Sequence, residues 1–210
     1  MEKTKTAFIQ LHLSVMLAGF TGLFGKLITL NEVDIVWYRM FFTSLILIVF
    51  TGLPKISLKK LAQLAMCGAL LGLHWMMFYG SIKASNVSIG VICYSLVGVF
   101  TAIFEPAILK RKFSWTEIAF SLITVLGLLC VFSFDSRYRY GILIGVGSAA
   151  ISSIYSIFNK KYSKGIKSRT VLFYEMSAGL VIVTAIIPIY TTIFNIHQDI
   201  QVIPSGSNLW

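Results

Sequence analysis

The sequence predicts an all-α membrane protein, a polytopic bundle of helices that crosses the bilayer several times. Hydrophobic residues make up 57% of the 210 residues, charged residues make up 12%, and the mean hydropathy is +0.82. A chain of this composition has too few polar side chains to coat a water-soluble globule. Seven apolar stretches approach the ~20 residues that cross a hydrocarbon core about 30 Å thick, and in lipid such stretches form helices. The predicted spans are residues 7–28, 35–51, 61–83, 87–109, 116–134, 141–162 and 171–190.

The positive charges lie in alternate gaps between these spans. Thirteen of the 18 lysines and arginines fall on one side of the predicted membrane: Lys3, Lys5, Lys55, Lys59, Lys60, Lys110, Arg111, Lys112, Lys160, Lys161, Lys164, Lys167 and Arg169. Basic loops stay in the cytoplasm. We therefore predict a cytoplasmic N-terminus, residues 191–210 outside, and a location in the bacterial inner membrane. Although the net charge is +10, no soluble domain presents a basic face, so nucleic-acid binding is not expected.

The first apolar stretch is predicted to be a signal anchor, because it is too long for a cleaved signal peptide and no small-residue cleavage site follows it. Cys67, Cys93 and Cys130 fall in three different spans without Cys-x-x-Cys spacing. This placement argues against a disulfide framework or a metal site. The chain also contains no metalloprotease, nucleotide-binding or hydrolase motif, so we expect neither an enzyme nor a cofactor.

The sixth and seventh spans repeat features of the first and second. A shift of 134 positions aligns Ser14 with Ser148 and Lys26 with Lys160, and two further residues align the segments 38–40 and 174–176. The copies are five spans apart, an odd number, so the second must be inverted in the membrane. Inverted repeats are typical of secondary transporters. We predict a first five-helix repeat over residues 1–136 and an incomplete second repeat over residues 137–210.

Several stretches carry a resemblance to a known family. They are VWYRMF at 36–41, SIKASNVS at 81–88, YSLVGVFTA at 94–102, the basic turn KRKFSW at 110–115, and the span around Gly127. In these features the chain resembles the EamA branch of the drug/metabolite transporters. The resemblance implies ten helices arranged as two inverted five-helix repeats, of which this chain covers about seven.

Two positions depart from the pattern of that family. Gly98 stands where members often have proline, so no kink can be assumed there. Arg111 stands where many members have glutamate, and the nearest acid, Glu105, lies six residues earlier.

Charged residues inside the spans are candidates for function because burying them in lipid is costly. Arg39 and Lys26 lie in the outer halves of their spans, where they either attract anionic substrates or extend to lipid phosphates. Glu105 and Glu175 lie near the inner ends. Each either binds a proton or cation, or forms an ion pair with a nearby basic loop.

His74 lies near the middle of its span and could bind substrate or relay a proton. The alternative is a neutral imidazole that hydrogen bonds to a neighbouring helix. A polar stripe on one face of the sixth span either lines a wet cavity, which we favour, or allows close packing: Ser148, Ser152, Tyr155, Ser156 and Asn159. The Gly-x-x-x-Gly pairs at residues 68–72 and 141–145 are interpreted as packing faces.

These features predict a secondary transporter that exports a small metabolite by alternating access. Its expected partners are that metabolite, the lipid bilayer and a second copy of the chain. The alternatives are a seven-span scaffold or receptor, or a transporter fragment without activity of its own. Receptors of the rhodopsin type place the N-terminus outside, opposite to the orientation that the charges indicate.

Overall fold

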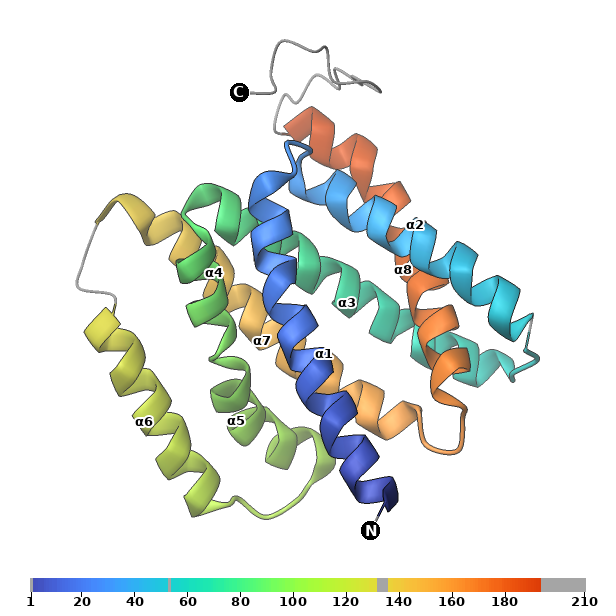
Figure 1. Ribbon diagram of the computed structural model, residues 1–210, viewed down its shortest axis with the longest axis horizontal. Helices are drawn as coiled ribbons and strands as arrows, with labels where there is room; N and C mark the ends of the chain where they lie inside the picture. The colour runs from blue at the N-terminus through green and yellow to red at the C-terminus, as the bar shows by residue number, and fades with distance from the viewer. Residues whose placement is uncertain (1, 53, 132–135, 194–210) are drawn as a thin grey trace.

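The fold is all-α, as predicted (Figure 1). The computed structural model describes residues 2–52, 54–131 and 136–193, and these ranges contain no strand. The elements are α1 (Glu2–Leu27), α2 (Glu32–Thr51), α3 (Leu58–Ala84), α4 (Val87–Tyr94), α5 (Val97–Leu109), α6 (Trp115–Val131), the 3₁₀ turn η1 (Ser136–Tyr138), α7 (Arg139–Tyr162) and α8 (Ser168–Ile193).

Six helical segments of the described chain are long and apolar enough to cross a membrane. They are α1, α2, α3, the α4–α5 pair, α7 and α8. The remaining apolar helix, α6, has 17 described residues, at the short end of the ~17–25 that span a bilayer. The last residues of the predicted span 116–134 lie outside the described residues. The polytopic membrane bundle is confirmed.

Several helices begin earlier than their predicted spans. Helix α2 starts at Glu32 and α3 at Leu58, each three residues before the predicted start. The difference arises because the spans followed the apolar run, whereas the helix begins after a capping side chain. Asn31 caps α2 by accepting a hydrogen bond from the backbone N–H of Asp34 at 2.8 Å, and Ser57 caps α3.

The predicted span 87–109 is not one continuous helix. It divides into α4 and α5 at Ser95 and Leu96, and the two parts follow different directions (Figure 1). The backbone N–H of Leu96 bonds to the carbonyl of Cys93 at 3.1 Å, a tighter three-residue spacing. The hydroxyl of Ser95 also donates to the carbonyl of Ile92 at 2.6 Å. A helix therefore breaks here without proline.

Helix α3 lies at the centre of the bundle and packs most extensively against α7 and α8. Glycines permit these close approaches. A side chain at Gly68 would meet the backbone of α8, and one at Gly145 would meet Cys93 and Ser81. Both predicted Gly-x-x-x-Gly pairs are thus packing faces. Helix α2 packs against α8, α1 has fewer contacts with α3 and α4, and α6 lies at the edge beside α5 (Figure 1).

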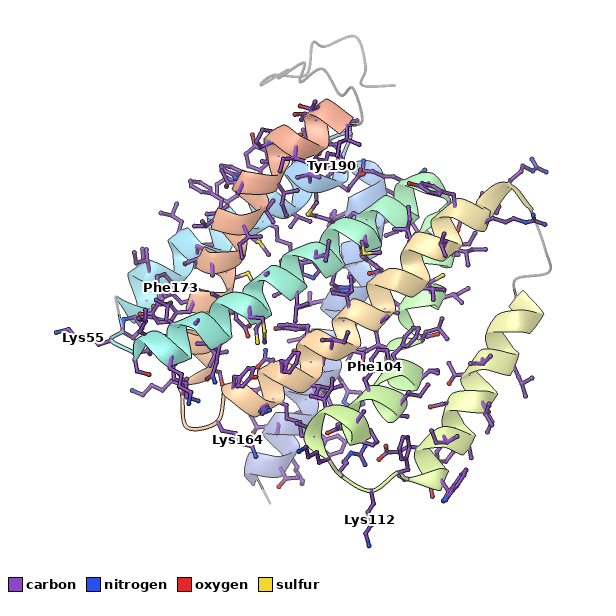
Figure 2. The ribbon with its side chains drawn as sticks, turned by 180° about the vertical axis from the view of Figure 1, so that it is seen from behind. Lys55, Phe104, Lys112, Lys164, Phe173 and Tyr190 are labelled. Atoms are coloured by element: carbon purple, nitrogen blue, oxygen red, sulfur yellow. The ribbon has the colours of Figure 1, made fainter. Side chains whose placement is uncertain are left out.

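The outer surface is apolar along the helices and basic at one end. Large apolar side chains point outward, such as Leu143 at 70% exposed and Val181 at 69% exposed. Lys55, Lys164 and Lys112, from three different loops, lie from the left edge to the bottom of Figure 2, whereas Tyr190 lies near the top. This surface matches a bilayer with basic loops on one side.

Candidate functional site

Buried polar side chains gather where α3 meets α7 and α8, a region that we call the central seam. It contains His74 at 4% exposed and Glu175 at 1% exposed, with the buried hydroxyls of Ser148 and Ser152. Such groups are costly to bury in a membrane protein unless they are bonded or functional. The central seam is therefore the candidate site.

His74 is bonded to α7 in the middle of the central seam. Its Nδ1 lies 2.8 Å from Oγ of Ser148 and 3.1 Å from the carbonyl oxygen of Ser148. The hydroxyl of Ser148 in turn donates to the backbone carbonyl of His74 at 3.0 Å. Phe78 lies beside the imidazole, and so does Tyr94, at 5.4 Å between ring centroids. The sequence analysis did not assign Tyr94 to the site, because its contact with His74 depends on how α4 packs against α3.

Glu175 forms a hydrogen-bonded cluster with Tyr155 and Asn159, which we call the carboxyl cluster. The Tyr155 hydroxyl donates to Oε2 of Glu175 at 3.1 Å. The Asn159 amide donates to the Tyr155 oxygen at 2.8 Å and to Oε2 of Glu175 at 3.4 Å. Oε1 of Glu175 is buried and has no hydrogen-bond partner within the described ranges. The structure thus brings together three predicted residues.

A cavity of about 440 Å³ adjoins the carboxyl cluster at the basic end of the bundle. Tyr155, Asn159 and Glu175 form one wall, and Ser163 and Ser168 line it near the α7–α8 loop. Lys164 marks this loop in Figure 2. Two residues of the polar stripe of α7, Tyr155 and Asn159, therefore line this cavity, whereas Ser148 and Ser152 are buried.

The crossing of α3 and α8 explains the burial of Glu175. Gly68 and Gly179 bring the two backbones together, and a Cβ at Gly179 would lie 2.8 Å from the carbonyl oxygen of Gly68. Glu175 precedes Gly179 by four residues, so both lie on the face of α8 that meets α3. The glycines therefore enclose the carboxyl group between the helices.

Glu105 forms the ion pairs that were one of its two predicted roles. Its carboxylate lies 2.7 Å from Nζ of Lys160 and 3.1 Å from Nη2 of Arg111. Nη2 of Arg111 also lies 2.7 Å from the carboxylate of Glu117. The hydrogen bond that Arg111 donates to the Glu117 carboxylate, with the negative charge of Glu105, raises the pKa of the Arg111 guanidinium. These pairs connect α5 and α6 to α7, and Arg111 gains a partner despite its departure from the family pattern.

The Arg39 side chain contacts two aromatic residues of α3. Its Nη1 donates to the Tyr79 hydroxyl at 2.9 Å, and its guanidinium lies 3.8 Å from the centre of the Trp75 ring. Lys26 is exposed on α1 and is not part of this group. The sequence missed the aromatic partners because they lie on another helix, 36 and 40 residues later.

The described residues contain no group of three His, Cys, Asp or Glu side chains placed to hold a metal ion. Cys67 and Cys93 are buried free thiols within them. The side chain of Cys130 is not among those that the structure describes.

Comparison with known proteins gives a consistent assignment. The pattern of the EamA-like transporter family matches residues 5–133. In Bacillus subtilis (strain 168), the uncharacterized transporter YxxF is 22% identical over 193 residues, and the uncharacterized transporter YcxC is 27% identical over 195 residues. Each alignment covers 86% of this chain and 62% of the relative, so the chain spans less than two thirds of their length.

A third relative, the uncharacterized transporter YdfC of the same organism, is 26% identical over 77% of this chain and 56% of its own length. No solved structure matches the chain significantly. The family pattern covers more than half of the residues, including the loops and spans on which the resemblance rests. The chain belongs to the EamA-like transporter family.

Proposed function

We propose that this multi-pass membrane protein acts in secondary transport and exports a small metabolite by alternating access. The supporting observation is the central seam, where buried polar groups on α3 face α7 and α8 across the boundary between the predicted repeats. In transporters with inverted repeats, substrate binds where the repeats meet, and movement of one repeat changes access to that position. His74 and Glu175 lie at this boundary.

The proposed repeats cover residues 1–136 and 137–210. Helices α2 and α8, which the sequence alignment pairs, lie side by side in the bundle (Figure 1). Their aligned residues Met40 and Met176 are both buried in one hydrophobic core. This placement favours a pseudo-symmetric pair of helices near the repeat axis.

Within this proposal the site residues have distinct roles. Arg39 and Lys26 guide anionic groups at the outer side, and His74 contacts substrate at the middle of the membrane. The carboxyl cluster acts at the inner side, with Ser152 one helical turn before Tyr155 on the same stripe of α7. Glu105 has two cationic partners. These ion pairs favour a structural role for Glu105 over the binding of a proton or cation.

We propose that the protein lies in the inner membrane and that its basic loops face the cytoplasm. Labelled lysines from three of these loops lie at the same end of the bundle (Figure 2). Anionic lipid head groups on the cytoplasmic leaflet would attract them.

A metabolite-resolved comparison of cells with and without the full gene product tests the transport function. We expect one or more small metabolites to accumulate inside cells that lack it. His74→Gln and Glu175→Gln should each lower the export rate about tenfold, which corresponds to about 1.4 kcal/mol in the barrier, because glutamine cannot bind and release a proton. Insertion into the membrane should be unchanged.

Val181→Ala is the matched control, because this side chain points outward from α8. It should leave both export and insertion unchanged. Identical metabolite profiles with and without the gene product would contradict the transport function, and full export by both site variants would contradict their roles.

A further inference from the structure

We infer that Glu175 carries the proton that couples transport to the proton gradient, and that Tyr155 and Asn159 connect it to the cavity beside the α7–α8 loop. This inference rests on the proposed transport function and adds the driving ion. It starts from the carboxyl cluster and from the groups that surround it.

Glu175 is enclosed without a compensating charge. Its side chain is 1% exposed, and its Oε1 has no hydrogen-bond partner among the described residues. No lysine, arginine or histidine of the described chain forms an ion pair with it. Enclosing a carboxylate anion in this way is far more costly than enclosing a neutral carboxylic acid. The closed arrangement therefore favours a bound proton.

No charged group on the described parts of the neighbouring helices forms an ion pair with Glu175. The titratable groups that face Glu175 are the Cys67 thiol on α3 and the Tyr155 hydroxyl on α7. The charged or titratable residues with other contacts are Glu32 with Tyr190, Asp34 with Asn31, Arg39 with Tyr79, Lys60 with the Tyr162 carbonyl, His74 with Ser148, and Lys160 with Glu105. None of these contacts supplies a cation to Glu175.

A hydrogen-bonded connection leads from Glu175 to the cavity. Oε2 accepts from the Tyr155 hydroxyl, and the Tyr155 oxygen accepts from the Asn159 amide. All three side chains line the cavity of about 440 Å³, together with the hydroxyl-bearing Ser163 and Ser168. A cavity of this size and polarity holds water. A proton can thus leave the carboxyl group on this side after a small movement of the cluster.

In each transport cycle the Glu175 carboxyl group releases one proton and binds one proton. When the bundle opens at its basic end, the O–H bond of Glu175 breaks, the proton passes to water in the cavity, and a carboxylate remains. The enclosed arrangement is restored when the carboxylate takes a proton from water on the opposite side. The carboxylate form crosses to the outward-open state together with the exported metabolite, and the protonated form, which is neutral when enclosed, returns without metabolite. One proton therefore enters for each metabolite that leaves, and the gradient sets the direction.

The contrast with Glu105 provides a matched control. Glu105 is also a buried acid near the basic end, at 8% exposed, but it has Lys160 and Arg111 as partners. It is expected to remain an ion pair and to take no part in proton transfer.

Infrared difference spectroscopy of the full-length protein in lipid vesicles tests the proton site, with the proton itself as the probe. A jump from acidic to alkaline pH should remove the C=O band of a protonated carboxyl group in the wild type and in Glu105→Gln. Glu175→Gln should lack this band. Its glutamine can still accept from Tyr155, so the cluster is preserved. A band of full intensity in Glu175→Gln would overturn the assignment.

A second measurement tests the coupling, with the metabolite that the cell comparison identifies. In the wild type, an imposed pH gradient should stimulate export above the exchange of labelled for unlabelled metabolite at equal pH. Glu175→Gln should lose this stimulation, whereas the control Glu105→Gln should keep it. Gradient stimulation equal to that of the wild type would overturn the inference. A wild-type protein that transports nothing in either mode would contradict the proposed function, whereas the infrared result would still decide whether Glu175 binds a proton.

Discussion

Gly68→Ala should destabilise the protein by about 3 kcal/mol, the upper part of the range for overpacked sites. The new Cβ would lie 2.2 Å from the carbonyl oxygen of Glu175 and 3.0 Å from the backbone nitrogen of Gly179. These are backbone atoms, so no change of rotamer relieves the contact. We expect α8 to separate from α3 and the carboxyl cluster to open. Thermal unfolding of the purified protein in detergent measures the change.

Gly127→Ala in α6 is the matched control, because no atom of the described chain lies within 4 Å of the Cβ that it would add. Alanine is favoured over glycine in a helix by about 1 kcal/mol, so this variant should be as stable as the wild type or slightly more stable. The two substitutions are chemically identical and should change stability in opposite directions. A Gly68→Ala protein that unfolds at the wild-type temperature would contradict the close α3–α8 crossing.

Glu105→Ala should destabilise the protein by about 1–3 kcal/mol, since it leaves Lys160 and Arg111 without their shared acid. The estimate is below that for a fully buried pair because the Lys160 side chain is 66% exposed and solvent screens its charge. The ion pairs connect α5 and α6 to α7, so their loss should loosen the basic end first. Denaturant unfolding at low and high salt measures both the loss and its screening.

Glu117→Ala is the comparison variant for Glu105→Ala. Glu117 also pairs with Arg111, but its side chain is 46% exposed, and surface pairs contribute about 0–1 kcal/mol. The effect of Glu117→Ala should therefore be clearly smaller than that of Glu105→Ala. Equal effects would show that Glu105 is not the centre of this ion-pair group.

Hydropathy was sufficient to predict the main features of the fold. The six long helices follow the predicted spans because backbone groups in lipid have few alternatives to a helix. The predicted spans begin three residues after the true starts of α2 and α3, although the capping residues Asn31 and Ser57 were visible in the sequence. The break between α4 and α5 was not predicted, since Ser95 and Leu96 carry no strong breaking signal.

The candidate site was predictable residue by residue, but its contacts were not. Tyr155 and Asn159 were placed together because residues four apart share a helical face. Glu175 was recognised as an acid within a span, yet its position beside them depends on how α7 and α8 each pack against α3. The pairing of Glu105 with Lys160 joins residues 55 positions apart. Such pairs require the tertiary arrangement, which one sequence without an alignment does not determine.

The orientation of the bundle underlies every proposed role, and cysteine labelling tests it most directly. Cys67, Cys93 and Cys130 are first replaced by alanine, and Lys112→Cys and Leu30→Cys are then introduced separately at opposite ends. A membrane-impermeant maleimide should label Leu30→Cys in intact cells and label Lys112→Cys only after the membrane is disrupted. Labelling of Lys112→Cys in intact cells, with Leu30→Cys protected, would contradict the cytoplasmic placement of the basic loops and the transport roles assigned from it.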